Sequence, residues 1–353
     1  MALMRLGVSI VMAANQIQEQ PENEYLLISQ QPIRGLLQHL NALSLEEGIV
    51  RSRFACGHSP IYRKVSLETT LEKQMFFPVM GHALNPDNTL LLPLGIESST
   101  SDWLSGDVEE QSARIQQAIE SSHKIFALGL YDEIRLCYTA PEFQQDLESR
   151  TVHLGLDVFG LAGTPIFAPL DGTFVTVHDN AQEQDYGPTL MLQHKDLSGE
   201  SFFTLYGHLD PECLELWQPG DSVQAGIRIA RIGASPRNGN WPPHLHLQVI
   251  SHRMGWETDF PGVALPSEQS FWKEISPNPY RLLGIPEKSW TEPESLPRNL
   301  LARRLHIMGR NLSLSYKEPL TILRGEGVYL IAALGRRFVD CVNNVAHVGH
   351  CHP

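Results

Sequence analysis

The sequence predicts an α+β protein whose central part consists mainly of β-strands, and three patterns lead to this expectation. Polar residues alternate with Leu and Val from His153 to Val158 and again from His244 to Val249, which is the period of a strand with one buried face. Glycines punctuate the chain between these two segments, as they do between strands. Outside this centre, residues 107–125 carry apolar side chains at the spacing of an amphipathic helix.

The N-terminal segment is expected to form two helices joined by a loop. Residues 5–12 and 33–40 are rich in aliphatic side chains, and a polar stretch separates them. A short signal peptide is the alternative interpretation of the first residues. We favour a core helix because Gly7 and Ser9 interrupt the apolar run. No run of the sequence approaches the ~18 apolar residues that a membrane span needs.

Two further segments mark the organisation of the chain. Residues 90–96 are almost entirely aliphatic and are expected to form a buried strand. Residues 287–297 are rich in Pro, Ser and Glu, and this composition is typical of a linker. With 353 residues, the chain is long enough for roughly two domains.

Composition limits the class of protein and its partners. The formal net charge is −13, which argues against nucleic acid or an anionic membrane surface as a partner. The 5 cysteines are odd in number and include no C-x-x-C pair. Such thiols are typical of a reducing compartment, so we expect a cytoplasmic protein.

Three short motifs together predict one metal site. They are the H-x-x-x-D of His153 and Asp157, the Tyr-Gly-His that ends at His208, and the H-x-H of His244 and His246. Two histidines and one carboxylate leave a tetrahedral zinc ion one open position, which a catalytic site needs for water. Either short motif alone would usually be chance in a chain with 15 histidines. Their joint occurrence in a strand pattern favours zinc.

The same residues resemble the lysostaphin-type (LytM-like) zinc metallopeptidases. Residues 162–172, 186–194 and 219–233 are similar to the glycine-rich strands and turns of that family, so the resemblance covers about residues 140–252. It implies an antiparallel β domain with His153, Asp157 and His246 as zinc ligands. It also implies that His208 and His244 are catalytic residues that handle the attacking water and the substrate carbonyl.

The chemistry of these residues also follows from general principles. Zinc lowers the pKa of bound water to about 7 and polarises a carbonyl group. A nearby neutral imidazole can take the proton of the water, and another can stabilise the oxyanion. His244 lies two residues from His246, so on a strand both point into the same cleft. A helical H-x-x-x-D is disfavoured because Gly155 lies inside it.

Other histidines of the central part are expected to be bystanders. Replacing His178 by Ala is expected not to affect zinc binding, and His194 ends an apolar run. His194 could border the cleft, but a solvated histidine at the end of a strand is the favoured interpretation.

Both ends of the chain resemble other enzymes. Residues 1–56 are similar to the C-terminal tail of aminoglycoside-phosphotransferase-like kinases, without their catalytic motifs. Residues from Leu312 to Pro353 resemble the opening strands of class III aminotransferases. The lysine that binds pyridoxal phosphate lies further along that fold, so this cofactor and transamination are expected only in a full-length parent protein. His347, His350 and His352 would then be structural or lie near that cofactor.

These resemblances suggest a slice of a cytosolic fusion protein, divided into a kinase-like tail, a connecting segment, the zinc domain, a linker and a truncated aminotransferase start. The corresponding ranges are 1–60, 61–138, 139–286, 287–298 and 299–353. The expected function is zinc-dependent hydrolysis of an amide or peptide bond in a small substrate. A zinc-binding scaffold without activity is the alternative, and the sequence leaves the oligomeric state open.

Overall fold

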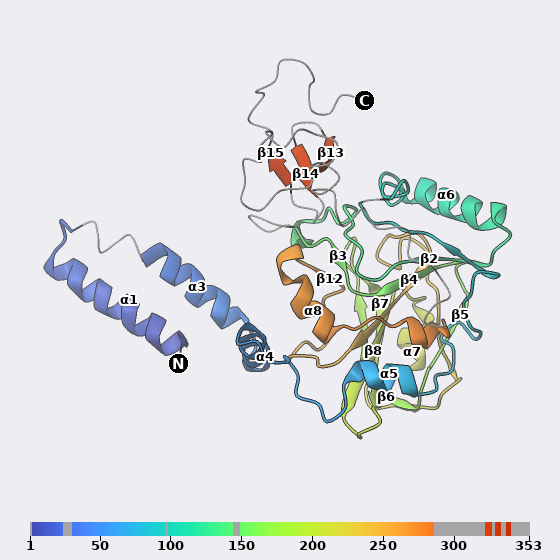
Figure 1. Ribbon diagram of the computed structural model, residues 1–353, viewed down its shortest axis with the longest axis horizontal. Helices are drawn as coiled ribbons and strands as arrows, with labels where there is room; N and C mark the ends of the chain where they lie inside the picture. Colours follow the sequence, from blue (N-terminus) through green and yellow to red (C-terminus); the bar gives the residue numbers. More distant parts are fainter. Residues whose placement is uncertain are drawn as a thin grey trace, which may run out of the picture. The chain divides into compact units, whose positions relative to one another are not determined.

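A computed structural model of the chain describes residues 2–23, 30–96, 98–143, 149–285, 322–326, 329–332 and 337–339. The chain divides into two compact units (Figure 1). The first consists of Met1–Tyr62 with Met254–Trp256, and the second of Arg63–Arg253 with Glu257–Pro353. The predicted linker at residues 287–298 lies outside the described residues, as do His347, His350 and His352.

The first unit is helical, as predicted. It contains α1 (Ala2–Glu19), α3 (Gln30–Ala42) and α4 (Leu45–Ala55), and α1 lies against α3 (Figure 1). The Ser44 side chain caps α4 by accepting a hydrogen bond from the backbone N–H of Glu47 at 3.0 Å, which satisfies one of the free donors at a helix start. None of the described helices is long and apolar enough to cross a bilayer.

The second unit is built on one mixed sheet. Within the described residues, eight of its strands are hydrogen-bonded in the order β1-β2-β4-β11-β8-β7-β6-β9, and every pair except β1–β2 is antiparallel. The bounds are β1 (Thr89–Leu91), β2 (Phe126–Gly129), β4 (Leu156–Phe159), β11 (His244–Ile250), β8 (Ser201–Gly207), β7 (Gly187–Lys195), β6 (Gly172–Asn180) and β9 (Ser222–Val223). The predicted α+β class with a mainly antiparallel β centre is confirmed.

Shorter elements surround this sheet. Two-stranded ribbons pair β10 (Arg228–Arg231) with β5 (Pro165–Phe167), and β12 (Val263–Ala264) with β3 (Val152–His153). The helices and 3-10 turns are α5 (Leu67–Lys73), α6 (Val108–Ser121), η1 (Pro141–Phe143), α7 (Glu212–Leu216), η2 (Pro266–Glu268), α8 (Gln269–Ile275) and η3 (Tyr280–Leu283). Helix α6 lies inside the predicted helix at residues 107–125, with Asp107 as its N-cap.

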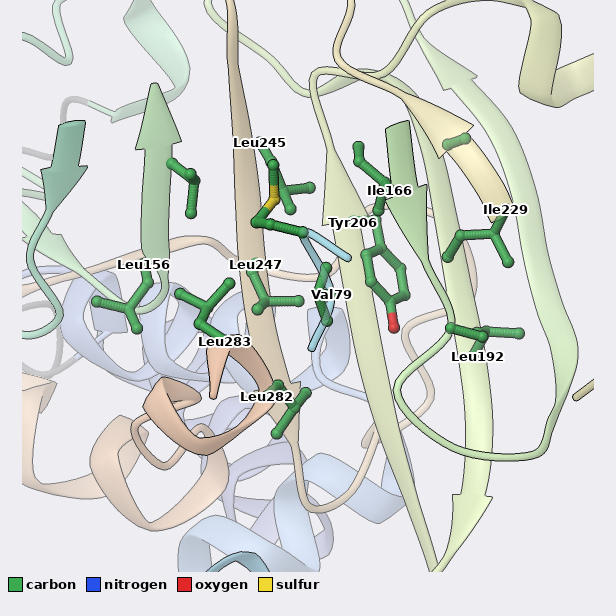
Figure 2. Packing of buried hydrophobic residues seen from close by; sticks show 14 of the residues in the cluster. Val79, Leu156, Ile166, Leu192, Tyr206, Ile229, Leu245, Leu247, Leu282 and Leu283 are labelled. Atoms are coloured by element: carbon green, nitrogen blue, oxygen red, sulfur yellow. The ribbon is translucent and has the colours of Figure 1, made fainter. Parts of the chain in front are cut away.

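One face of the sheet carries the larger hydrophobic core. Leu245 and Leu247 of β11 lie beside Leu156 of β4 and Tyr206 of β8 (Figure 2). Side chains of the β5–β10 ribbon and of η3 cover them, among them Ile166 of β5 (Figure 2). This is the aliphatic face that the alternating sequence pattern predicts.

The opposite face of the sheet is also covered, which the sequence pattern did not predict. Residues from 92 to 143 form a second hydrophobic cluster there, in which Leu94, Ile115 and Tyr138 join Phe159 of β4 and Trp241. Every residue of β4 and β11 is therefore buried. The expectation of half-buried strands is wrong because α6 and side chains from residues 92–104 and 137–143 cover the polar face as well.

The C-terminal segment forms a small antiparallel sheet of its own within the described residues. Its strands are β13 (Ile322–Glu326), β14 (Tyr329–Ala332) and β15 (Arg337–Val339), in that order. Among the residues that the structure describes, the side chains of Tyr329 and Val339 are 43% and 58% exposed.

Candidate metal centre

The register of three central strands brings the polar groups of the motifs into one row. On β11, His246 lies opposite Asp157 of β4 on one side and opposite Gly207, at the end of β8, on the other. Because side chains alternate along a strand, His244 faces the same way as His246. Leu245 and Leu247 between and after them point into the core (Figure 2). His153 joins the row from β3, which pairs with β12.

Three of the predicted residues converge closely enough to bind one metal ion. His153 Nε2 lies 3.0 Å from His246 Nδ1, and Asp157 Oδ1 lies 3.2 and 3.1 Å from these two nitrogens. His153, Asp157 and His246 are all buried, at 1%, 3% and 3% exposure. The segment 153–158 is not a single strand, however. Residues 154 and 155 separate β3 from β4, so His153 reaches the site from a different ribbon.

Hydrogen bonds on the far side of each ring leave a lone pair facing the cluster. His153 Nδ1 donates to the carbonyl oxygen of Leu130 at 3.0 Å, which leaves Nε2 as the acceptor. His246 Nε2 lies 3.2 Å from Gln248 Oε1, and the amide nitrogen of Gln248 donates to Pro261 O and Ser276 Oγ. That orientation makes Gln248 Oε1 the acceptor, so His246 Nδ1 carries the lone pair. Metal-binding histidines are commonly oriented by such partners, and the donor set fits zinc.

His208 and His244 form a second pair beside this cluster. Their ring centroids are 4.2 Å apart, and His244 Nε2 lies 3.9 Å from Asp157 Oδ1. His208 Nδ1 donates to Asn238 O at 2.8 Å, and His244 Nδ1 donates to Pro242 O at 2.7 Å. Each ring therefore presents an unprotonated Nε2.

The backbone of His208 adopts an uncommon conformation. Its φ is +61° directly after the end of β8, and its N–H donates to Tyr186 O at 2.7 Å. Such a conformation costs of order 1–3 kcal/mol outside glycine and is concentrated at functional sites. The structure thus places His208 immediately after the end of β8.

Burial keeps three histidines of the site, His153, His208 and His244, neutral. It lowers the pKa of His153 to about 4, with the Arg135 guanidinium as the second cause. Burial lowers the pKa of His208 well below its usual range, and His244 and His246 add to this effect. The pKa of His244 is lowered mainly by burial too. At neutral pH these rings can therefore bind a metal ion or accept a proton.

Comparison with known proteins agrees with this geometry. Residues 151–259 match the model of Peptidase family M23. This range contains all five predicted site residues, namely His153, Asp157, His208, His244 and His246.

Similar solved structures include a zinc-containing peptidase from Vibrio cholerae, with 29% identity over 32% of this chain and 31% of that chain, at a TM-score of 0.24. The catalytic domain of lysostaphin from Staphylococcus simulans aligns with 24% identity over 35% of this chain and 80% of that chain, also at a TM-score of 0.24.

Curated proteins match over short segments and belong to a different class. An alanine–glyoxylate aminotransferase 2-like protein of Drosophila melanogaster is 47% identical over 64 residues, or 18% of this chain. An ethanolamine-phosphate phospho-lyase homolog of Caenorhabditis elegans is 33% identical over 69 residues, or 19% of this chain. The chain spans only 13% and 15% of the lengths of these two relatives.

One residue of the M23-like site lies outside the matched range and was not predicted. Arg135 is 2% exposed, and its Nη1 lies 2.5 Å from Asp157 Oδ2. Burial alone raises the pKa of Asp157, but His153 and Arg135 outweigh burial and hold the pKa of that carboxyl well below its usual range. Since His153 is neutral above about pH 4, the lasting positive charge is that of Arg135. No sequence motif surrounds Arg135 that could have indicated its role.

A small cavity opens beside the site. Its volume is about 120 Å³, and its lining includes His208, His244 and His246. Aromatic side chains of Tyr138 and Trp241 form part of its wall. The lining residues Leu104, Tyr138 and Phe143 belong to the cluster that covers the polar face of the sheet. Part of the cavity wall therefore lies outside the M23 match.

The remaining histidines of this region take no part in the site. His178 is exposed on β6. His194 is neither solvated nor at the cleft: it is 2% exposed on β7 and hydrogen-bonds Asp171 O and Thr204 Oγ1. The favoured interpretation of His194 is therefore wrong, because β7 lies inside the sheet and its neighbours bury the end of the strand.

Proposed function

We propose that the chain is a zinc-dependent hydrolase of an amide or peptide bond, with His153, Asp157 and His246 as the metal ligands. One observation carries the proposal. Two imidazole lone pairs and one carboxylate oxygen converge within hydrogen-bonding distance of each other, directly beside a second pair of neutral histidines. The match to Peptidase family M23 supports the same class of chemistry.

The ligand residues would supply three protein donors and leave a position for water. When bound, zinc would polarise the scissile carbonyl group and lower the pKa of the attacking water. Asp157 contributes the single negative charge among the three donors. Its pKa is held well below its usual range, so it is ionised above about pH 4, where His153 is neutral.

His208 and His244 would act as the catalytic residues for proton transfer. Each has its Nδ1 proton held by a backbone carbonyl, so each Nε2 can accept a proton from the attacking water. A ring that has accepted this proton becomes a donor at Nε2. It can then hydrogen-bond the developing oxyanion or protonate the leaving amine.

The size of the cavity supports a small substrate. A volume of about 120 Å³ is below the 300–1,000 Å³ of typical ligand pockets, which favours a short peptide or a small amide over a polymer. The net charge of −13 disfavours nucleic acid and anionic membranes as partners. The described cysteines, Cys56, Cys137 and Cys213, are free thiols, which supports a cytoplasmic location.

A zinc-binding scaffold without activity is the second candidate, and burial favours it. None of the five site residues is more than 6% exposed, and the cavity that they line has a volume of only about 120 Å³. The short matches to aminotransferases support a fusion partner of that class, and we assign no aminotransferase activity to this chain from them.

The first experiment measures zinc content and then activity. The purified chain is expected to contain one zinc per chain, and Asp157→Ala should weaken zinc binding by orders of magnitude. His178→Ala is the matched control, because His178 is exposed on the same domain. A screen of amides and short peptides then separates the two candidates. Zinc binding without turnover of any substrate supports the scaffold, and full zinc retention in a His153→Ala/His246→Ala variant contradicts the ligand assignment.

A further inference from the structure

Arg135 is as deeply buried as the metal-binding cluster that it contacts. Its side chain is 2% exposed, and its partners Asp157 and Glu133 are 4% and 9% exposed. Burying a guanidinium group is costly unless it is paired and its N–H groups are hydrogen-bonded. Arg135 meets this condition through Asp157, through Glu133 Oε2 at 2.9 Å, and through the carbonyl oxygen of Leu130 at 3.3 Å.

The two oxygens of Asp157 have different partners. Oδ2 lies 2.5 Å from Arg135 Nη1, whereas Oδ1 lies 3.2 and 3.1 Å from the metal-facing nitrogens of His153 and His246. Arg135 therefore occupies one oxygen and leaves the other for the metal. This arrangement favours binding of a metal ion through Oδ1 alone.

The backbone beside Asp157 leaves room for the guanidinium group. Gly129 of β2 lies directly opposite Asp157 in the sheet. A Cβ atom at Gly129 would lie 2.8 Å from Arg135 Nη2 and 3.4 Å from Asp157 Cβ. Any other residue at this cross-strand position would therefore push the guanidinium group away from the carboxylate.

The turn that carries Arg135 also orients a second ligand. The carbonyl oxygen of Leu130 accepts the Nδ1 proton of His153. Glu133 holds the turn in place, because its Oε1 accepts the backbone N–H of Leu94 at 2.8 Å and its Oε2 accepts that of Leu130 at 3.2 Å. The backbone of Glu133 also accepts the N–H of His153 at 2.8 Å.

We propose that Arg135 is a positioning residue of the metal centre, which restricts Asp157 to one-oxygen binding while its turn fixes the ring of His153. The inference rests on the proposed zinc site. All residues of the turn precede the M23 match, which begins at residue 151. Some of the hydrogen bonds that orient the predicted metal ligands therefore come from the segment before the match.

Charge and geometry make opposite contributions, so the experiment must separate them. The positive charge of Arg135 beside Asp157 opposes zinc binding, whereas an oriented carboxylate favours it. Replacing Glu133 and Arg135 together by Gln and Met removes both charges of the pair and the donor to Asp157. The net charge of the pair is unchanged in this variant, so the remaining effect is that the Asp157 carboxylate is no longer oriented. This should weaken zinc binding by about 10–100-fold.

Arg63 provides a matched control in the same unit. It forms a buried ion pair with Asp196 at 2.9 Å, with the two side chains 8% and 0% exposed. The Arg63→Met/Asp196→Asn variant removes a comparable buried pair that does not contact a predicted ligand. It should lower the melting temperature without changing zinc affinity.

The test compares the full chain with both double variants by zinc competition and by the visible spectrum of the Co²⁺-substituted protein. Weaker zinc binding and a less intense Co²⁺ spectrum, the sign of a higher coordination number, are expected only in Glu133→Gln/Arg135→Met. Equal losses in both variants, or no change in either, would overturn the proposal. If that variant does not fold, Arg135→Lys keeps the charge but not the fork of donors. It should change the Co²⁺ spectrum in the same direction, and an unaltered spectrum contradicts the proposal. Failure of the native chain to bind either metal would instead reject the zinc site itself.

Discussion

Gly155 is the position at which the smallest change should damage the metal site most. It lies between His153 and Asp157, where a Cβ atom would stand 2.6 Å from His246 Cε1 and 2.7 Å from His246 Nε2. The same atom would be 2.7 Å from the carbonyl oxygen of Leu247. In the Gly155→Ala variant, the ring of His246 must therefore move by about 0.8 Å to restore an ordinary contact of 3.4 Å.

This displacement exceeds what a metal site tolerates. Ligand groups must be held within about 0.5 Å of their productive geometry, and a misplacement near 1 Å can cost about 10²-fold in activity. The backbone cannot absorb the shift, because β11 is paired with β4 on one side and with β8 on the other. We expect Gly155→Ala to weaken zinc binding by about 10–100-fold, and to lower the stability of the metal-free protein by about 1–3 kcal/mol through overpacking.

Zinc titration and denaturant unfolding of the metal-free protein measure the two effects separately. Gly48→Ala is the control, since Gly48 lies inside α4 and a Cβ atom there has no neighbour within 4 Å. It should leave zinc affinity unchanged and stabilise the helix slightly. Unaltered zinc affinity in Gly155→Ala would refute the inferred packing of His246 against this glycine.

Two further predictions concern histidines. His208→Ala and His244→Ala should each retain zinc and lose turnover by roughly 10²–10⁴-fold, as expected of groups in proton transfer or oxyanion stabilisation; zinc loss in either variant would contradict the assigned role. Burial lowers the pKa of His194 from 6.5 to about 4. Between pH 4 and 6.5, His194 is therefore protonated in the unfolded chain but neutral in the folded protein. His194 thus contributes full stability above pH 6.5 and loses about 1.4 kcal/mol per pH unit below it, about 3 kcal/mol in all. Denaturant unfolding of the metal-free proteins between pH 4 and 7 measures how steeply the free energy of unfolding depends on pH. This dependence should be less steep in His194→Gln than in the native protein, and identical slopes would exclude the effect.

The approximate positions of the helices follow from local patterns that the structure confirms. Helix α6 begins after the Asp107 cap and follows the apolar spacing of the sequence, because capping and amphipathic spacing are properties of consecutive residues. The strand from residue 90 is shorter than predicted: β1 ends at Leu91, although Leu92 and Leu94 remain buried.

The sequence by itself determined which side chains could meet at a metal site, since His153, Asp157, His208, His244 and His246 lie in short motifs with alternating polar and aliphatic residues. Only the tertiary structure decided what surrounds them. Arg135 and the aromatic wall of the cavity reach the site from a segment without any motif, and His194 is buried by strands on both sides. Periodicity records which face of a strand a residue occupies, but it carries no information about which distant segment covers that face. The pairing of β2 with β4 and the packing of residues 92–143 decide that.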